Sequence, residues 1–182
     1  VGDCLIISEY IEGSGDNKAL ELYNCGSSPL QLSDFGACIV YNKNSSCSSE
    51  AMLPNKTLAP QKVHTLCHTD SGPSGNPVDG IQNNCQQPAS TVVNFNGNDR
   101  LVVFEDKSGN GAYDPTKDAL MDAFGQPSTA PGSEIWSDTT YRRCKLQPYR
   151  GKSTFDVKDW YTAHPKNDAS HYGTPPSRAS CP

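Results

Sequence analysis

The sequence has little positive charge, little methionine and no long hydrophobic run, and each shortage argues against a class of protein. Its 182 residues carry 15 Lys and Arg against 20 Asp and Glu, which gives a net charge of −5. A nonspecific hold on DNA or RNA depends on clustered Lys and Arg, so a nucleic-acid partner is not expected. No stretch is long and apolar enough to form a membrane-spanning helix. Two Met beside 15 Gly and 14 Pro favour strands and turns over helices.

The residue patterns of common catalytic and zinc sites are also missing. The chain has no G-x-S-x-G turn and no C-x-x-C pair. His64 and His68 have the spacing of a zinc pair on a helix, but they lie in and beside a strand-like run that ends at Cys67. Residues four apart on a strand are separated by about 13 Å, which is too far for one metal ion. We therefore do not expect an enzyme.

Cysteine, by contrast, is abundant and spread from end to end. An even number without metal-type spacing indicates disulfides formed in an oxidising compartment. Eight are present: Cys4, Cys25, Cys38, Cys47, Cys67, Cys85, Cys144 and Cys181. We therefore expect a secreted, extracellular protein and interpret Val1 as the first residue left after removal of a signal peptide. Two sequons, at Asn44 and Asn55, are glycosylation candidates in polar loops.

Two disulfides are predicted from the loops that they would close. Cys38 and Cys47 flank a short polar loop, and Cys67 and Cys85 flank a longer segment rich in Gly, Pro and Asn. The other four cysteines would pair among themselves, in an order that the sequence leaves open.

Short apolar runs of strand type recur along the chain between turn residues. Eight are present: Cys4–Tyr10, Ala19–Asn24, Ala37–Asn42, Lys62–Cys67, Ser90–Phe95, Arg100–Glu105, Ala119–Phe124 and Thr139–Cys144. The Asn-Gly turn within Asn96–Asp99 predicts a hairpin between two of them. Helix signals are few, with one or two turns expected within Phe155–Ala163. This pattern predicts an antiparallel sandwich or barrel.

Five of these motifs, in this order, carry a family resemblance. "LIISEYIEGSGDNKALELYNCGSSPLQLSDF", "NFNGNDRLVVFED", "LMDAFG", "TTYRRC" and "FDVKDWYTA" together resemble the lamin tail domain family, from about Leu5 to Ala163. The departures are the Cys-rich loops, an insertion over His68–Ala89 and the tail after Ala163. The resemblance implies an all-β, immunoglobulin-like antiparallel β-sandwich of about seven to nine strands without catalytic activity. It would span residues 1–163, with a Pro-rich tail at 164–182 that Cys181 fastens.

The resemblance also implies a role. Family members serve in protein–protein, protein–nucleic acid and attachment functions, so we expect a non-catalytic binding or structural module for extracellular attachment or assembly. Its partner would be an extracellular protein, a glycan or a second copy of the chain, because exposed edge strands allow self-association. A carbohydrate-binding module and an extracellular nuclease or nuclease-accessory domain are the alternatives, the latter opposed by the acidic balance.

Three further groups of residues are candidates for function. Glu9 and Glu21 lie in strands among apolar residues, so each needs a partner if it is buried; Lys18, Arg100, Arg142 and Arg143 are the candidates. We favour structural pairing over solvent exposure or a ligand-binding role. Trp136 and Trp160 are candidate ligand contacts, although large aromatic residues in a small domain more often fill the core.

The third group is the acidic stretch "EDKSGNGAYDPTKD" (Glu105–Asp118), which partly matches a calcium loop. Calcium needs six to eight oxygen ligands, and alternating residues here supply them. The candidate ligands are Asp106, Ser108, Asn110, the carbonyl of Ala112, Asp114 and Asp118. The match is incomplete, because Lys117 stands where an EF-hand has its closing Glu. The alternative is a turn-rich hairpin tip in which Asp, Asn, Ser and Gly serve the backbone alone.

Overall fold

A computed structural model describes residues 3–68, 79–89, 91–126, 136–144, 146 and 160–176, with only the backbone at 79 and 161–163. Almost all of the regular structure in this part of the chain is β-strand. The two helical elements are short: a 3-10 turn at Leu32–Asp34 and α1 at Asp79–Asn84. The described residues include no helix long and apolar enough to cross a membrane.

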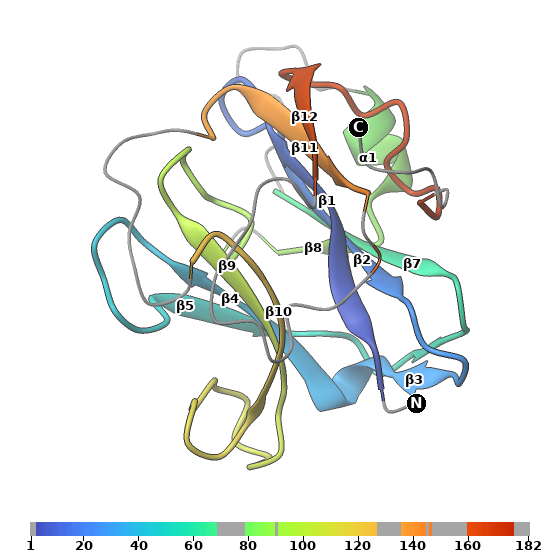
Figure 1. Cartoon of the computed structure of the whole chain (residues 1–182), viewed down its shortest axis with the longest axis vertical. Coiled ribbons are helices and arrows are strands. Elements are labelled where there is room, and N and C mark those ends of the chain that lie inside the picture. Colours follow the sequence, from blue (N-terminus) through green and yellow to red (C-terminus); the bar gives the residue numbers. More distant parts are fainter. Residues whose placement is uncertain are drawn as a thin grey trace.

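The strands form two main sheets (Figure 1). The first sheet has the order β12 (Trp160–Pro165), β11 (Thr139–Arg143), β1 (Leu5–Glu12), β2 (Lys18–Asn24), β7 (Val63–Cys67) and β8 (Gln87–Pro88). The second has the order β10 (Ala119–Phe124), β9 (Arg100–Glu105), β4 (Phe35–Val40) and β5 (Ser49–Met52). A two-stranded ladder joins β3 (Leu30–Gln31) to β6 (Thr57–Leu58). The pairing is antiparallel except between β7 and β8.

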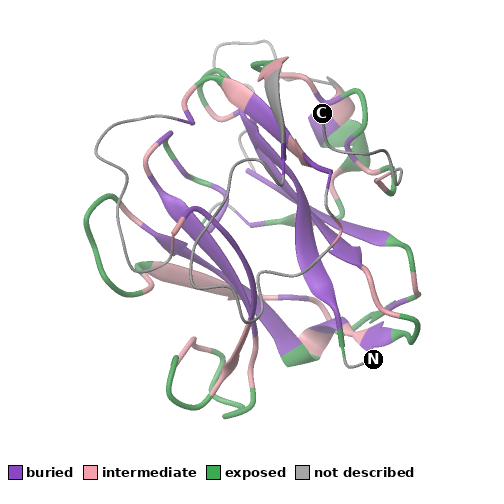
Figure 2. Ribbon diagram, viewed as in Figure 1, coloured by how far each residue is buried: buried purple, intermediate pink, exposed green. Residues whose placement is uncertain are grey.

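The inward faces of the two sheets share one core, so the predicted all-β sandwich is confirmed. The core joins Leu20 and Leu22 of β2 to Leu101 and Val103 of β9, and Figure 2 shows the central strands of both sheets buried. Its centre is a group of stacked rings, in which Tyr10 lies 4.1 Å from Phe124, centroid to centroid. The strands number twelve in the described residues, more than predicted, because four of them have only two to four residues.

Two predicted elements are wrong. Ser90–Phe95 forms no strand in its described part, although Val92 and Phe95 are fully buried. Backbone N–H groups there donate to the carbonyl of Ala89 in a tight turn, so burial rather than pairing explains the apolar run. The described part of the expected helix, from Trp160 onward, is instead strand β12, because it pairs with β11 and places Trp160 in the core.

Both predicted local disulfides are confirmed, Cys38–Cys47 and Cys67–Cys85. A third links Cys4 to Cys25, the residues that precede β1 and follow β2, with the Cα atoms 5.1 Å apart. Cys144 also takes part in a disulfide, while Cys181 lies outside the described residues.

Candidate functional site

A β-bulge in β1 turns two consecutive side chains to the outer face of the first sheet. The register with β2 shifts between Ile7 and Glu9, which leaves Ser8 as the extra residue. Ile7 and Tyr10 point into the core, while Ser8 and Glu9 both line a cavity outside it. A bulge of this kind re-aims side chains without disturbing the core on either side.

The bulge is supported from the second sheet. Asp122 of β10 is completely buried, and its carboxylate accepts a hydrogen bond of 2.8 Å from the Ile7 N–H. Arg143 pairs with the same carboxylate at 3.0 Å and lies 4.6 Å from the Trp160 ring centroid. The Asp122 carboxylate, paired with Arg143, therefore provides the acceptor for a backbone N–H beside the bulge.

Glu21 of β2 stands directly opposite Glu9. Its neighbours Leu20 and Leu22 are core residues, so the strand's alternation points Glu21 to the same outer face as Glu9. Both residues are buried, with exposed fractions of 2% for Glu9 and 1% for Glu21. Two ionised carboxylates opposite each other on a sheet repel, and burial adds to this cost.

The C-terminal segment, residues 164–176, runs over this face and covers the carboxyl pair. Gly173 donates its N–H to Glu21 Oε2 at 2.8 Å, and Tyr172 donates its hydroxyl to the carbonyl of Leu66 at 2.7 Å. At its other end, Asn167 Oδ1 accepts the Ser14 N–H at 2.9 Å. Gly13 has no side chain to hinder this contact, since an added Cβ would lie 2.0 Å from Asn167 Oδ1. The segment is therefore attached at both ends.

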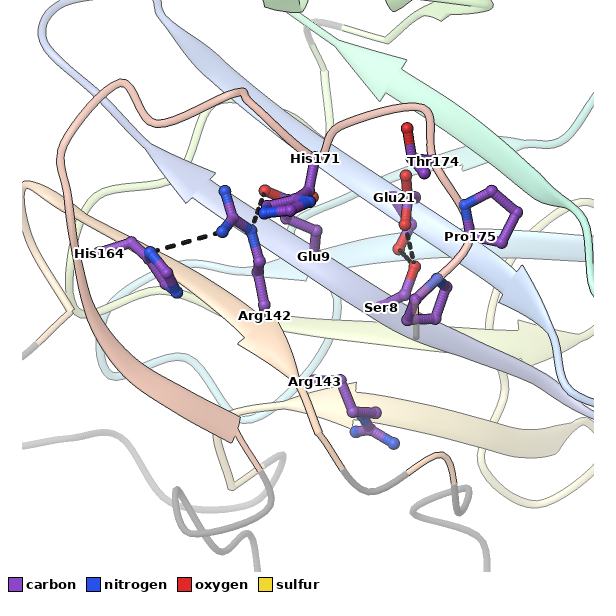
Figure 3. A pocket seen from close by; sticks show the side chains of 10 residues that line it. Ser8, Glu9, Glu21, Arg142, Arg143, His164, His171, Thr174 and Pro175 are labelled. Atoms are coloured by element: carbon purple, nitrogen blue, oxygen red, sulfur yellow. Dashed lines mark hydrogen bonds and ion pairs between the residues drawn. The ribbon is translucent and has the colours of Figure 1, made fainter. Parts of the chain in front are cut away.

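A cavity of about 430 Å³ lies between the sheet and the C-terminal segment. Figure 3 shows its lining, with Ser8 and Glu21 pointing toward each other and Thr174 and Pro175 next to them. The lining residues are Ser8, Glu9, Glu21, Arg142, Arg143, His164, His171, Thr174, Pro175 and Pro176.

Arg142 links the sheet to the C-terminal segment. Its guanidinium lies 3.2 Å from Glu9 Oε1 and 3.1 Å from Asp168 Oδ2. It also donates to the Ser170 hydroxyl at 3.1 Å. The His164 ring lies 3.2 Å from Asp168 and 3.4 Å from Arg142. The one guanidinium is therefore shared by two carboxylates.

The two facing carboxyl groups titrate near neutral pH. Burial raises the pKa of Glu9 to about 8; Arg142 opposes the rise and the Glu21 charge adds to it. Burial also raises the pKa of Glu21 to about 7, against hydrogen bonds from Ser8 and Gly173. Burial, together with the Arg142 charge, lowers the pKa of His164. At neutral pH the cavity therefore contains carboxyl groups that exchange protons with solvent.

Of the four cations expected to serve Glu9 and Glu21, only Arg142 forms an ion pair with either in the described residues. Lys18 pairs with Glu12 at 3.1 Å. Arg100 donates to the carbonyls of Asn42 and Asn44. The sequence singled out Glu9 and Glu21 but not that they face each other. Ser8, His171 and Thr174 were missed, because the bulge has no sequence signal of its own and the predicted tail has no pattern that shows where it lies on the sheet.

The candidate calcium loop connects β9 to β10, and its carboxylates accept hydrogen bonds from the loop. Asp106 accepts from the N–H groups of Gly109 and Gly111 at 2.6 and 2.8 Å. Asp118 accepts from Ser108 at 3.0 Å and from Asp114 at 2.8 Å.

The other side chains of this loop are engaged in the same way. Asn110 accepts the Ala112 N–H at 2.8 Å, and Lys117 lies 2.8 Å from Asp114. Burial raises the pKa of Asp106, but its hydrogen bonds outweigh burial and lower it overall. No group of three or more His, Cys, Asp or Glu with metal-binding geometry occurs among the described residues. The calcium site stays a prediction.

The remaining candidates lie apart from the cavity's open side. Trp136 and Trp160 are 4% and 2% exposed and pack on Phe124, each with ring centroids 5.0 Å from it. Both side chains therefore belong to the core, as is more common for large aromatic residues in a small domain, and we do not retain them as ligand contacts. Asn44 and Asn55 are both exposed, which leaves the glycosylation prediction open.

Comparisons with known proteins place the fold and nothing more specific. No family model matches the chain, and no curated protein matches it. It is similar in structure to a DUF4876 family protein from Bacteroides thetaiotaomicron, with a TM-score of 0.60 and 11% sequence identity. The match covers 95% of this chain and 74% of that protein. At this identity the likeness concerns the fold alone.

Proposed function

We propose that this chain is a non-catalytic binding module of a secreted protein, and that the cavity beneath the C-terminal segment is its binding site. The observation that carries the proposal is the cavity itself, about 430 Å³ in volume. Its size falls within the usual range for small-ligand sites, and its lining combines apolar surface with a few converging polar groups. Glu9, Glu21 and Arg142 are the charged groups among them that face one another across β1, β2 and β11.

The extracellular location is part of the same proposal. Three disulfides join the described strands and loops, and such bonds persist in oxidising compartments. The motif series of the lamin tail domain family adds support, and membership of that family is likewise proposed. The carbohydrate alternative relied on Trp136 and Trp160; because both are buried, we do not propose it.

The binding proposal is tested by blocking the mouth of the cavity. Thr174 is exposed and lines it, so Thr174→Trp fills the space while leaving the core intact. Thr91→Trp makes the same change at an exposed turn elsewhere. We expect ligands found by a thermal-shift screen of extracellular glycans, peptides and small molecules to bind wild type and Thr91→Trp but not Thr174→Trp. Ligands that bind all three proteins equally would place the site elsewhere, and a screen without ligands would leave a structural role.

A further inference from the structure

Resting on the proposed function, we infer that the cavity binds an organic cation, an ammonium or guanidinium group, with Glu21 as its counter-ion. The geometry points to this class because, among the described residues that line the cavity or pair with its lining, carboxyl groups outnumber guanidinium groups. Glu21 is only 1% exposed and lines the space that a ligand would fill.

The charges around the cavity are unequal. Glu9, Glu21, Arg142 and Arg143 line it, while Asp168 and Asp122 are not part of the lining and pair with the two guanidinium groups. When all of these described residues are ionised, four carboxylates stand against two guanidinium groups. Each guanidinium is already held: Arg142 bridges Glu9 and Asp168, and Arg143 faces Asp122.

Glu21 is the carboxyl group that this arrangement leaves with neutral partners. Its oxygens accept hydrogen bonds from the Ser8 hydroxyl at 2.6 Å and from the Gly173 N–H at 2.8 Å. Among the described residues it forms no ion pair, and Arg142 acts on it only from beyond ion-pair distance. A ligand's cation would supply the missing charge, whereas an anionic ligand would add to the repulsion.

The walls suit the carbon chain that carries such a cation. Pro175 and Pro176 form an apolar side, and the cavity volume exceeds what a bare ammonium group needs. Long cationic side chains typically lay their methylene groups on apolar surface and extend the charge to a polar one. The ligand would be a free amine or the Lys or Arg side chain of a partner.

Binding would be linked to proton release. The titratable and charged groups around Glu21 are Glu9 on β1, Arg142 and Arg143 on β11, and His164, His171 and Tyr172 on the C-terminal segment; Asp168 acts on the neighbouring Glu9. A cation favours the ionised carboxylate, so each binding event expels protons from the Glu9–Glu21 pair. Affinity therefore rises as the pH rises through the range where the pair loses its protons.

The experiment is isothermal titration calorimetry of the whole chain with matched probes. Pentylamine represents a free amine and N-acetyl-lysine methylamide a protein side chain; pentanol and N-acetyl-norleucine methylamide are their neutral counterparts, and pentanoate is the anion. We expect one or both amines to bind, about tenfold more tightly at pH 8 than at pH 6, given a tenfold change per pH unit below a pKa. The amine that binds more tightly identifies the source of the cation. Repeating the titration in two buffers of different ionisation enthalpy counts the protons released by wild type.

Glu21→Gln is the matching variant, because an amide has nearly the same shape and no charge. Its oxygen can still accept the Gly173 N–H, and its NH2 group can donate to the Ser8 hydroxyl oxygen. We expect it to bind the amines at least about tenfold more weakly, the order of a lost charge–charge contact, and to lose most of the pH dependence. Glu50→Gln, on edge strand β5 of the other sheet, should bind like wild type.

Three results would overturn the inference: no heat from either amine, equal binding of the neutral probes, or the same binding enthalpy in both buffers, which means that no proton is released. If pentanol or pentanoate binds instead and Thr174→Trp blocks it, the cavity is still a binding site and only the ligand class is wrong. If no ligand responds to Thr174→Trp, the proposed function fails as well.

Discussion

Two buried acids facing each other set the chemistry of this molecule at the scale of single residues. Glu9 and Glu21 are directly opposed on neighbouring strands, and Arg142 pairs with only one of them. A buried carboxyl group without a cation avoids the cost of its charge by keeping its proton. The folded protein therefore holds protons that the unfolded chain would release at neutral pH.

The first prediction concerns how stability changes with pH. The pKa of Glu21 is raised from 4.5 to about 7 in the folded state. The stabilisation from its proton is complete below pH 4.5 and disappears as the pH rises through about 7. Wild type should therefore lose unfolding free energy between pH 5 and pH 9. Glu21→Gln removes this dependence, so its loss over the same range should be smaller by up to about 3 kcal/mol. Urea denaturation of both proteins at both pH values measures this difference. An equal change in unfolding free energy for the two proteins would show that Glu21 is ionised throughout this pH range.

The second prediction concerns Asp106 in the β9–β10 loop. Asp106→Ala removes the acceptor for Gly109 and Gly111, so we expect a loss of about 1 kcal/mol of unfolding free energy in EDTA. If Asp106 helps to bind calcium, the same substitution should cost more unfolding free energy in calcium chloride than in EDTA. The same loss in both solutions would contradict the calcium prediction, and Asn94→Ala, at an exposed position, serves as the control.

At the scale of elements, strands with regular alternation could be predicted and irregular ones could not. Lys18–Asn24 and Arg100–Glu105 were identified nearly residue by residue, because burial on one or both faces leaves an apolar pattern. Residues 91–95 gave the same pattern although they form a buried turn. The bulge at Ser8 was invisible for a related reason: one inserted polar residue within an apolar run has no distinct signature.

The third prediction tests the disulfide that holds α1 to the sheet. Cys67–Cys85 closes a loop with a sequence separation of 18 residues. Replacing both cysteines with Ser should cost about 3 kcal/mol of unfolding free energy, mainly because the unfolded chain gains conformational entropy when the loop is no longer closed. The pair Cys38–Cys47, with a separation of 9, should cost less when replaced in the same way. Equal costs in guanidinium denaturation would argue against loop closure as the cause.

At the scale of the whole molecule, the sandwich could be predicted but the cavity could not. Strand number and turn spacing led to the fold class without knowledge of which strands pair. The cavity depends on how residues 164–176 lie on the sheet. The sequence indicated a tail resting on the domain, but Pro-rich polar segments have no periodicity from which a binding face can be derived.

The fourth prediction concerns that packing. Tyr172 is 2% exposed and joins a cluster with Ile11, Ala19 and Ile81, which spans β1, β2 and α1. Tyr172→Ala should therefore cost about 3 kcal/mol of unfolding free energy. A loss below about 1 kcal/mol, typical of surface substitutions, would show that residues 1–163 are stable without this contact. His171→Ala, at an exposed neighbour, is the control.

The cavity joins residues near one end of the described chain to residues near the other: Ser8, Glu9 and Glu21 meet His164, His171 and Thr174. During synthesis the first group emerges long before the second, so a nascent chain passes through a stage in which two acids lie on a strand face without Arg142 or their cover. Contacts of such sequence separation form late. A binding site assembled this way forms only after residues 164–176 have been synthesised and have packed on the sheet, so a product truncated before them cannot contain it.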